Sequence, residues 1–326
     1  QDRVVQAVKS RDWSGDMLFS LFCLIPFLTF FIPFIYRAFL HSPQDLKKKY
    51  NAEWALVTGA SSGIGKAIVE RLCGQGLNVV MVALDDAILK EAHAEMQKRF
   101  PMLQLRVVGA DLSRDGYIKT IADKTKDIKV SIVFNNAGFM LTGMFADTPE
   151  DRILGNYECN ATSAVRITHL FANRMLDANI KGAICFTSSP AGCIPNPFAV
   201  MYGSTKAFLT EFASSLAPEL RSKGIDVSVV HPSPVNSLFY SAVPSKHMIS
   251  AISFFKSTGT SPFTIADALL ANVGRTVLIE QGYFCVFVRG IILKVLDFAL
   301  FADLIARFAH MMPDFKKVSV DRKKAK

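Results

Sequence analysis

Short apolar runs alternate with helical patterns along most of this chain, and this alternation constrains the fold more than any other feature. The runs are residues 54–57, 78–83, 105–108, 131–134, 183–186, 226–230 and 283–287. Strand-length runs separated by helical stretches predict βα units, which assemble into a parallel sheet covered by helices on both faces. At 326 residues the chain is long enough for one large domain with attached segments. We therefore expect an α/β fold with a doubly wound parallel sheet.

A glycine-rich loop, TGASSGIG, follows the first apolar run. Gly59, Gly63 and Gly65 lie between that run and a helical pattern over residues 64–73. Glycines allow a tight turn there and let backbone N–H groups approach a pyrophosphate at the positive end of the helix. This arrangement is typical of a dinucleotide site in a Rossmann-like fold. The spacing G-x-x-x-G-x-G differs from the common G-x-G-x-x-G fingerprint, so a purely structural turn is the alternative.

Tyr202 and Lys206 are four residues apart, which places both side chains on one face of a helix. An ammonium near a phenol favours the phenolate, so we expect the pKa of Tyr202 to fall from about 10 toward working pH. Ser189 follows the run at residues 183–186, and its hydroxyl can bond a substrate oxygen beside Tyr202. A chance Y-x-x-x-K on a solvated helix face is the alternative for the pair.

These motifs come in one order along the chain: the glycine loop, Asn135-Asn136-Ala137-Gly138, Asn160, Ser189, and then Tyr202 with Lys206. In this order the chain resembles the short-chain dehydrogenase/reductase family over about residues 52–290. The resemblance implies hydride transfer between a nicotinamide cofactor and a carbonyl or hydroxyl group. It implies that Tyr202 exchanges the proton, Lys206 also holds the nicotinamide ribose, Ser189 orients the carbonyl and Asn160 keeps a water linked to Lys206.

The resemblance also implies which residues contact the cofactor. The glycine loop is similar to the family's cofactor loop, NNAG is similar to its sheet-stabilising motif, and Asp111 matches the acid that usually meets the adenine amino group. The expected contacts are Gly59, Ser61, Ser62, Gly63, Ile64, Gly65, Asp85, Asp111, Leu112, Asn136, Ala137, Gly138, Tyr202, Lys206, Pro232 and Val235. Ser233 follows Pro232 where the family usually has glycine, so we expect a different backbone shape beside the nicotinamide.

The choice between NAD(H) and NADP(H) depends on the end of the run at residues 78–83, where the ribose is recognised. Leu84, Asp85 and Asp86 follow that run, and neither they nor Ser62 supply a cation for a 2′-phosphate. Two carboxylates would repel that phosphate, so charge favours NAD(H). The acid typical of NAD enzymes would occupy the position of Ala83, so neither pattern fits. NADP(H) remains the alternative, because similar membrane reductases mostly use NADPH.

Residues 17–36 carry no charge and are rich in Phe, Leu and Ile, a length and composition that suit a bilayer span. We predict a membrane anchor here, preceded by a flank over residues 1–16 and followed by a basic linker over residues 37–51. Pro26 and Pro33 can kink the segment, so a kinked span and a re-entrant hairpin are both open.

Positive charge follows the predicted anchor at Arg37, Lys47, Lys48 and Lys49. By the positive-inside rule, this places the folded domain on the cytosolic side. A cleaved signal peptide is disfavoured, because the apolar stretch is long and lacks a clear cleavage site. The first residue is Gln1 rather than Met, which indicates a trimmed or processed N-terminus.

The C-terminal part is expected to associate with a membrane. Residues 284–312 are apolar with few charges, which favours helix on the membrane surface, with packing against a partner subunit as the alternative. We therefore assign residues 291–326 to a membrane-associated helix and basic tail. The net charge of +9 and this tail suit anionic headgroups, although a merely solubilising tail is equally consistent. The ending Lys323-Lys324-Ala325-Lys326 resembles a dilysine retrieval signal of endoplasmic reticulum membrane proteins, with other organelle membranes left open.

The segment at residues 236–261 corresponds to the substrate lid of the family. Its apolar side chains favour a lipophilic substrate that enters from the membrane, with core or bilayer contacts as the alternative. They are Leu238, Phe239, Tyr240, Met248, Ile249, Ile252, Phe254 and Phe255.

The chain most resembles the membrane-anchored 17β-hydroxysteroid dehydrogenase and very-long-chain 3-oxoacyl-CoA reductase group. An apolar N-terminal segment, a basic linker, the start WALVTGASSGIGKA and an apolar C-terminal extension carry this resemblance. It implies an oxidoreductase acting on a steroid or 3-oxoacyl lipid, either alone or as a homodimer. An accessory subunit of a membrane complex, with the fold and perhaps a nucleotide retained, is the competing hypothesis.

The remaining composition argues against other classes of protein. The six cysteines are scattered without a C-x-x-C pair or nearby histidines, so no metal site is expected and reduced thiols fit a cytosolic domain. The basic residues lack interleaved aromatic residues and no nucleic-acid-binding motif is present, so we expect no nucleic-acid partner.

Overall fold

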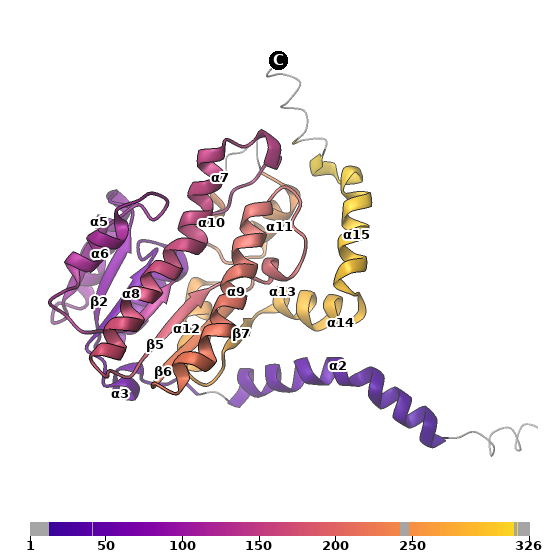
Figure 1. The fold of residues 1–326 in the computed structure, drawn as a ribbon, viewed down its shortest axis with the longest axis horizontal. Coiled ribbons are helices and arrows are strands. Elements are labelled where there is room, and N and C mark those ends of the chain that lie inside the picture. Colours follow the sequence, from indigo (N-terminus) through magenta and orange to yellow (C-terminus); the bar gives the residue numbers. More distant parts are fainter. Residues whose placement is uncertain (1–12, 41, 242–247, 316–317, 319–326) are drawn as a thin grey trace, which may run out of the picture.

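A seven-stranded parallel sheet forms the centre of the molecule (Figure 1). The computed structural model describes residues 13–40, 42–241, 248–315 and 318. The strand order is β3-β2-β1-β4-β5-β6-β7, and this doubly wound topology confirms the predicted Rossmann-like α/β fold. The strands are β1 (Trp54–Thr58), β2 (Asn78–Ala83), β3 (Leu105–Gly109), β4 (Val130–Asn135), β5 (Gly182–Thr187), β6 (Ile225–Pro232) and β7 (Leu278–Gln281).

Helices cover both faces of the sheet. One hydrophobic cluster joins the sheet to α4 (Gly63–Gly74), α5 (Ala87–Arg99) and α12 (Pro262–Asn272). A second cluster joins the opposite face to α6 (Tyr117–Lys124), α8 (Ser163–Asp177) and α9 (Val200–Arg221). Every residue of β1, β4 and β5 is buried, because a parallel sheet between two helix layers has no solvent-facing side.

Shorter helical segments join these elements or follow them in the chain. The α-helices are α7 (Glu150–Tyr157), α10 (Leu238–Ser241), α11 (Ser250–Ser257), α13 (Tyr283–Cys285), α14 (Leu293–Val295) and α15 (Phe298–Phe308). The 3₁₀ and π segments are η1 (Phe145–Asp147), η2 (Glu158–Thr162), η3 (Pro190–Cys193), η5 (Val286–Ile292) and η6 (Ala309–Met311).

The order in which strands are added to the sheet reverses between β1 and β4: β2 and β3 lie on one side of β1, and β4 to β7 lie on the other. Strand β1 pairs in parallel with β2 on one side and with β4 on the other. In such sheets, ligands bind beyond the carboxyl ends of the strands at this switch point. The glycine loop after β1 and the NNAG motif at the end of β4 both lie there.

The predicted strand at residues 283–287 is wrong. The last strand is β7, which begins five residues earlier, and residues 283–287 form α13 and the start of η5. β7 pairs with β6 only as far as Pro232 opposite Gln281. Proline has no N–H to continue a ladder, and Gly282 has a left-handed φ of 84° that turns the chain. The aromatic residues that follow therefore have no strand partner and coil into a helix.

The apolar N-terminal segment forms one helix, α2 (Trp13–Leu40), which continues through Pro26 and Pro33 rather than folding into a hairpin. Its stretch Met17–Arg37 has a mean hydropathy of 2.4 and is long enough to cross a bilayer. Most of its large side chains are exposed, but Phe30 is buried. Phe30 packs on η5, where a Cβ on Gly290 would lie 2.6 Å from its ring. The end of α2 is therefore docked on the domain, while its first part extends away (Figure 1).

A buried carboxylate joins α2 to the domain. Glu280 at the end of β7 is 2.9 Å from the Arg37 guanidinium and 2.9 Å from that of Arg289 in η5. Burial raises the pKa of Glu280, and the two guanidiniums oppose that shift. Arg37, predicted as a linker charge, is thus engaged by the folded domain.

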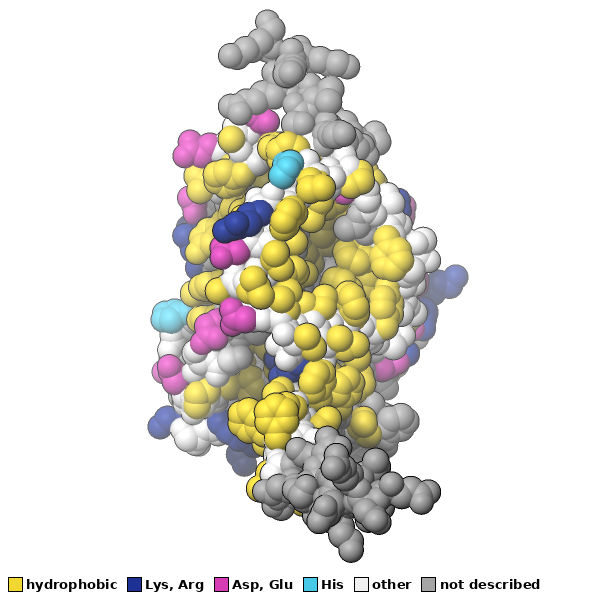
Figure 2. Space-filling view, turned by 90° about the vertical axis from the view of Figure 1, so that its right-hand side faces the viewer, with side chains coloured by type: hydrophobic (Ala, Val, Ile, Leu, Met, Phe, Trp, Pro, Cys, Tyr) yellow, Lys and Arg dark blue, Asp and Glu magenta, His cyan; other side chains and the backbone are white. Residues whose placement is uncertain are grey.

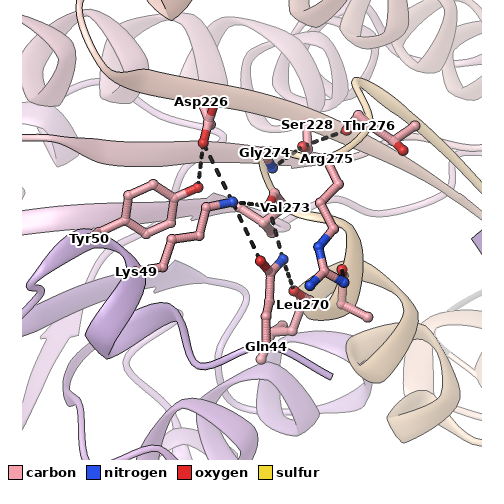
Figure 3. A network of polar contacts seen from close by, with 11 residues as sticks. Gln44, Lys49, Tyr50, Asp226, Ser228, Leu270, Val273, Gly274, Arg275 and Thr276 are labelled. Atoms are coloured by element: carbon pink, nitrogen blue, oxygen red, sulfur yellow. Dashed lines mark hydrogen bonds and ion pairs between the residues drawn. The ribbon is translucent and has the colours of Figure 1, made fainter. Parts of the chain in front are cut away.

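The linker after α2 docks beside the start of β6, whereas the glycine loop follows the carboxyl end of β1. Figure 3 shows the polar contacts of this linker. In α3 (Leu46–Tyr50), the Lys49 ammonium donates to the Val273 carbonyl at 2.6 Å and lies 3.7 Å from Asp226. The Tyr50 hydroxyl donates to the same carboxylate at 2.7 Å. Gln44 donates to the Val273 carbonyl at 2.9 Å. Residues predicted as a plain basic linker therefore fix the domain relative to the end of α2.

The C-terminal segment folds back along one side of the domain. Helices α14 and α15 lie there, and hydrophobic side chains gather over this face with few charges among them (Figures 1 and 2). Beyond α15, Phe315 and Val318 pack with Phe198 and Ile249 in a small cluster. The segment assigned to a tail therefore also contributes to the domain. The predicted dilysine ending lies outside the described residues.

Candidate active site

The glycine loop forms a cradle at the start of α4. Gly59 and Gly63 have left-handed φ values of 64° and 54°, which favour glycine. A Cβ on Gly65 would lie 2.1 Å from the Gly59 carbonyl oxygen, so the helix meets the loop too closely for any side chain. Ser62 is the N-cap of α4, but its side chain makes no capping hydrogen bond. The first-turn N–H groups thus lack a side-chain cap, and this fits a pyrophosphate at the helix N-terminus.

Asn136 ties the cradle to the neighbouring strands. Its Nδ2 donates to the Thr58 carbonyl at 3.1 Å, and its Oδ1 accepts from the Thr187 hydroxyl at 3.0 Å. The Thr58 hydroxyl accepts from the N–H groups of Asn136 and Ala137 at 3.0 and 2.9 Å. The NNAG motif therefore fixes the relative positions of β1, β4 and β5 at the switch point.

Asn160 lies within the π-helical segment η2, which interrupts the path from α7 to α8. Such π-bulges occur often at functional sites, because they turn a side chain out of the regular helical position. The Asn160 amide binds both backbone groups of Phe139, accepting from its N–H and donating to its carbonyl, each at 2.9 Å. Gly138 lies between Asn160 and Lys206: a Cβ there would be 3.1 Å from Asn160 Oδ1 and 3.5 Å from Lys206 Nζ.

The structure brings Ser189, Tyr202 and Lys206 together, as the sequence predicts. Ser189 N-caps η3 directly after β5, while Tyr202 and Lys206 lie one turn apart in the first half of α9. The Lys206 ammonium is 5.8 Å from the centre of the Tyr202 ring and donates to the Thr187 carbonyl at 2.7 Å. Thr187, two residues before Ser189, thus anchors the lysine.

Burial dominates the electrostatics of this trio. It lowers the pKa of Lys206 to about 8, since the charged form loses its hydration. It raises the pKa of Tyr202, and a hydrogen bond with Ser189 opposes that shift. The expected net fall in the pKa of Tyr202 is therefore wrong for the chain by itself, because desolvation of the phenolate is the largest cause of the shift and raises the pKa.

Ser189 and Tyr202 open into an apolar cavity of about 320 Å³, here called the catalytic cavity. This volume is within the range of small-molecule sites. Its apolar walls include Met140, Phe198, Ile249, Ile252, Phe255 and Phe284. A carbonyl placed against the two hydroxyls would thus lie in surroundings that exclude water.

The lid residues predicted from the sequence divide between two environments. Tyr240, Ile249, Ile252 and Phe255 line the catalytic cavity. The Phe239 ring packs 5.7 Å from that of Tyr202. In contrast, Leu238 and Phe254 are exposed.

The predicted ribose-reading position is only partly available to a ligand. The Asp86 carboxylate caps α5 by accepting from the Leu89 N–H at 2.9 Å, so one of its oxygens is already engaged. Asp85 is exposed beside Gly109, where a Cβ would be 2.7 Å from Asp85 Cβ. Asp111 accepts from the Ser113 N–H and hydroxyl through one oxygen.

The other predicted cofactor contacts lie around the same edge of the sheet. Ile64 and Ala137 pack against the core and Leu112 is buried within it, so their backbone groups are what the site can offer. Pro232 lines the catalytic cavity, and Val235 forms a β-bridge with Thr260.

Ser233, the residue that departs from the family pattern, has a structural partner. Its hydroxyl accepts from the Phe284 N–H at 3.0 Å, and its own N–H donates to the Gln281 carbonyl at 2.9 Å. The serine therefore joins the loop after β6 to the start of α13. This loop forms part of the cavity wall through Pro232 and Pro234.

Several residues of the site were not predicted. Thr58 and Thr187 hold the cradle and Lys206, and their position at strand ends beside the motifs was an available signal. Met312 and Asp314 line the catalytic cavity from the C-terminal segment. The sequence contains no signal that places these two residues in the site. The Asp314 carboxylate accepts from the Ser250 N–H at 2.9 Å and so connects that segment to α11.

Comparisons with known proteins agree with this geometry. The family model for short chain dehydrogenase matches residues 53–246. The very-long-chain 3-oxoacyl-CoA reductase of Meyerozyma guilliermondii is 28% identical over 282 residues, covering 82% of this chain and 79% of that protein. Human 17-beta-hydroxysteroid dehydrogenase type 3 is 32% identical over 188 residues, covering 57% of this chain and 60% of that protein.

Solved structures show the same fold. The bulky-bulky ketone specific alcohol dehydrogenase from Comamonas testosteroni superposes with a TM-score of 0.61 at 27% identity, covering 72% of this chain and 87% of that one. A short-chain dehydrogenase from Sphingobium yanoikuyae in complex with NADPH gives a TM-score of 0.63 at 26% identity, covering 70% and 87%. Together with the cradle and the Ser189, Tyr202 and Lys206 trio, these matches show that the chain belongs to the short-chain dehydrogenase family of nicotinamide-dependent oxidoreductases.

Proposed function

We propose that this protein is a membrane-bound oxidoreductase that transfers hydride between a nicotinamide cofactor and a carbonyl or hydroxyl of a lipophilic substrate. One observation carries the proposal: Ser189 and Tyr202 present their hydroxyls to a cavity whose other walls are mostly apolar. The relatives named as 3-oxoacyl-CoA reductase and 17-beta-hydroxysteroid dehydrogenase support a substrate of the 3-oxoacyl or steroid type.

The chain's own residues would handle the proton and the orientation of the substrate. The cofactor, held by the cradle at Gly59–Gly65 and by Lys206, supplies or accepts the hydride. Ser189 donates a hydrogen bond to the carbonyl oxygen, and Tyr202 gives that oxygen its proton as the carbonyl carbon is reduced. Lys206, desolvated and bound to the Thr187 carbonyl, stabilises the resulting phenolate. The reverse steps oxidise an alcohol.

For the cofactor, charge at Asp85 supports NAD(H), since an exposed carboxylate repels a 2′-phosphate. The Asp86 carboxylate caps α5 through one oxygen but keeps its negative charge, and so adds to this repulsion. Titration of the purified protein with NADH and NADPH tests the preference. The substitution Asp85→Ser should reduce the difference between the affinities for NADH and NADPH. Tighter binding of NADPH by the wild type would reverse the assignment.

For the membrane, the apolar stretch of α2 supports a span, and α15 supports contact with the bilayer surface. Leu300, Leu304, Phe308 and Met311 are exposed along α15 and η6. In Figure 1, the free part of α2 points away from the domain and α15 runs across that direction, as expected for a helix lying on the membrane that α2 crosses. The positive charges after α2 support a cytosolic domain, and we include an endoplasmic reticulum membrane in the proposal. Protease protection in microsomes tests this orientation.

The enzymatic proposal is tested with full-length protein in detergent micelles, NADH or NADPH, and a panel of ketosteroids and 3-oxoacyl thioesters. We expect cofactor oxidation with at least one of these substrate classes. Tyr202→Phe should reduce kcat by about 10² or more, since it removes the proton donor. Equal rates for Tyr202→Phe and the wild type, or no turnover with either class, would refute the proposal.

A further inference from the structure

A second apolar space lies between α15 and the first half of α9, outside the catalytic cavity. Its volume is about 490 Å³, and it is here called the α15 groove. One side is formed by Gly203, Ser204 and Ala207 of α9, and the other by Ala302, Ala306 and Ala309 around α15. No residue of α15 is buried, so the helix stands off the domain rather than packing against it.

The groove and the catalytic cavity share a wall. Residues 194–197, the loop between η3 and α9, line both spaces. Asn196 holds this loop, since its Nδ2 donates to the Ala191 and Ile194 carbonyls at 2.6 and 2.5 Å. Ser189 precedes the loop by five residues and Tyr202 follows it by five. A single loop therefore separates the reacting groups from the groove.

The lining of the groove indicates a slender apolar occupant. Apolar surface that faces water is unfavourable, so an open groove lined by apolar side chains gains free energy when an apolar occupant covers it. The alanine, glycine and serine residues are small, so they leave open space between the two helices. Ile194, Ile305 and Phe298 add apolar walls. Among the residues that the structure describes, no charged side chain lines the groove. A hydrocarbon chain matches this shape and polarity.

We propose that the α15 groove binds the distal hydrocarbon chain of the substrate whose carbonyl lies at Ser189 and Tyr202. This inference rests on the proposed oxidoreductase function and narrows its substrate to a long-chain carbonyl compound of the 3-oxoacyl type. A compact fused-ring substrate would occupy the catalytic cavity and leave the groove empty. A long flexible chain extends past residues 194–197 and occupies both spaces.

A chain-length series tests the proposal with full-length protein in detergent micelles. 3-Oxoacyl thioesters of increasing length are compared in the wild type and in Ala306→Trp, which fills the groove from the α15 side. In the wild type, kcat/KM should rise by up to about fourfold per methylene once the chain reaches the groove. In Ala306→Trp this rise should disappear, whereas the kcat/KM of the shortest substrate should stay unchanged.

Leu300→Trp is the matched control, since Leu300 is exposed on α15 but does not line the groove. It should leave the chain-length series as in the wild type. Ser204→Leu fills the groove from α9 and gives a second variant if Ala306→Trp does not fold. Equal loss of activity at all chain lengths in the groove variants, or a wild-type series without length dependence, would overturn the proposal.

A binding measurement separates failure of this proposal from failure of the proposed function. A long-chain ketone with a terminal diazirine is photolysed with the protein, and the labelled peptides are identified by mass spectrometry. Labelling of the peptides that contain Gly203 or Ala306, abolished in Ala306→Trp, supports the groove even without turnover. Turnover of long-chain substrates with labelling confined to other surfaces refutes the groove and leaves the oxidoreductase function intact.

Discussion

Replacement of Lys206 by methionine should abolish turnover. It should also raise the free energy of unfolding at neutral pH and lower it at high pH. Lys206 is fully enclosed at the base of the site, and burial lowers its pKa from 10.5 to about 8. Its folded-state pKa is below the unfolded value, so the unfolded chain binds more protons between pH 8 and 10.5. Stability therefore rises with pH across this window, and the cost of burying the cation is fully present below pH 8.

The magnitude follows from the shift. The difference of 10.5 − 8 = 2.5 pKa units corresponds to about 3 kcal/mol of the free energy of unfolding. Methionine avoids this cost but leaves the Thr187 carbonyl without its lysine donor, a loss of about 1 kcal/mol at any pH. We expect Lys206→Met to be more stable than the wild type by about 2 kcal/mol at pH 7, and less stable by about 1 kcal/mol above pH 10.5.

Urea unfolding in detergent micelles measures this difference, with the fluorescence of Trp54 in the buried strand β1 as the probe. Other titrating groups are common to both proteins and cancel in the comparison. Lys206→Met should also lose turnover, since in the proposed mechanism the lysine holds the cofactor and stabilises the Tyr202 phenolate. A stability difference that does not change between pH 7 and pH 10.5 would refute the account of Lys206 as a buried cation.

Three further predictions concern the cradle, the anchor and the C-terminal segment. Gly65→Ala places a methyl group against the Gly59 carbonyl, so nucleotide affinity should fall by about tenfold or more while circular dichroism is unchanged; normal affinity would contradict the close contact. Glu280→Ala leaves two guanidiniums without their carboxylate and should reduce the free energy of unfolding by about 3 kcal/mol; a loss under 1 kcal/mol would show that the cluster is well solvated. Asp314→Ala removes the contact with Ser250, so KM should rise by about tenfold with kcat little changed; equal losses in kcat would place Asp314 closer to the chemistry.

Most of the fold could be predicted, because its signals are local. Six of the seven predicted strands overlap the observed ones, and the motif order fixed which strand ends carry the site. The last strand was displaced because β propensity is a weak guide where the partner strand has ended: the aromatic run after Gly282 has no strand partner beyond Pro232. The position of the last strand is therefore set by where its partner strand ends and not by the residues of the aromatic run.

The residues of the site were predictable where a motif names them and unpredictable where the chain folds back. Asn160, Ser189, Tyr202 and Lys206 converge as expected. Asp314 and Met312 reach the same cavity from a segment whose composition indicates only membrane contact. Arg37 pairs with Glu280, which is 243 residues away in the sequence. Nothing in the sequence around Arg37 indicates this partner.

The sequence by itself determined the alternation of strands and helices, the cradle of glycines and the chemical identity of the proton-handling groups, since these depend on neighbours along the chain. Only the tertiary structure decided how those groups behave. The pKa values of Tyr202 and Lys206 follow from how deeply packing removes them from water. The catalytic cavity, the α15 groove and the docking of α2 arise from segments distant in sequence, because burial and shape are properties of the packed chain.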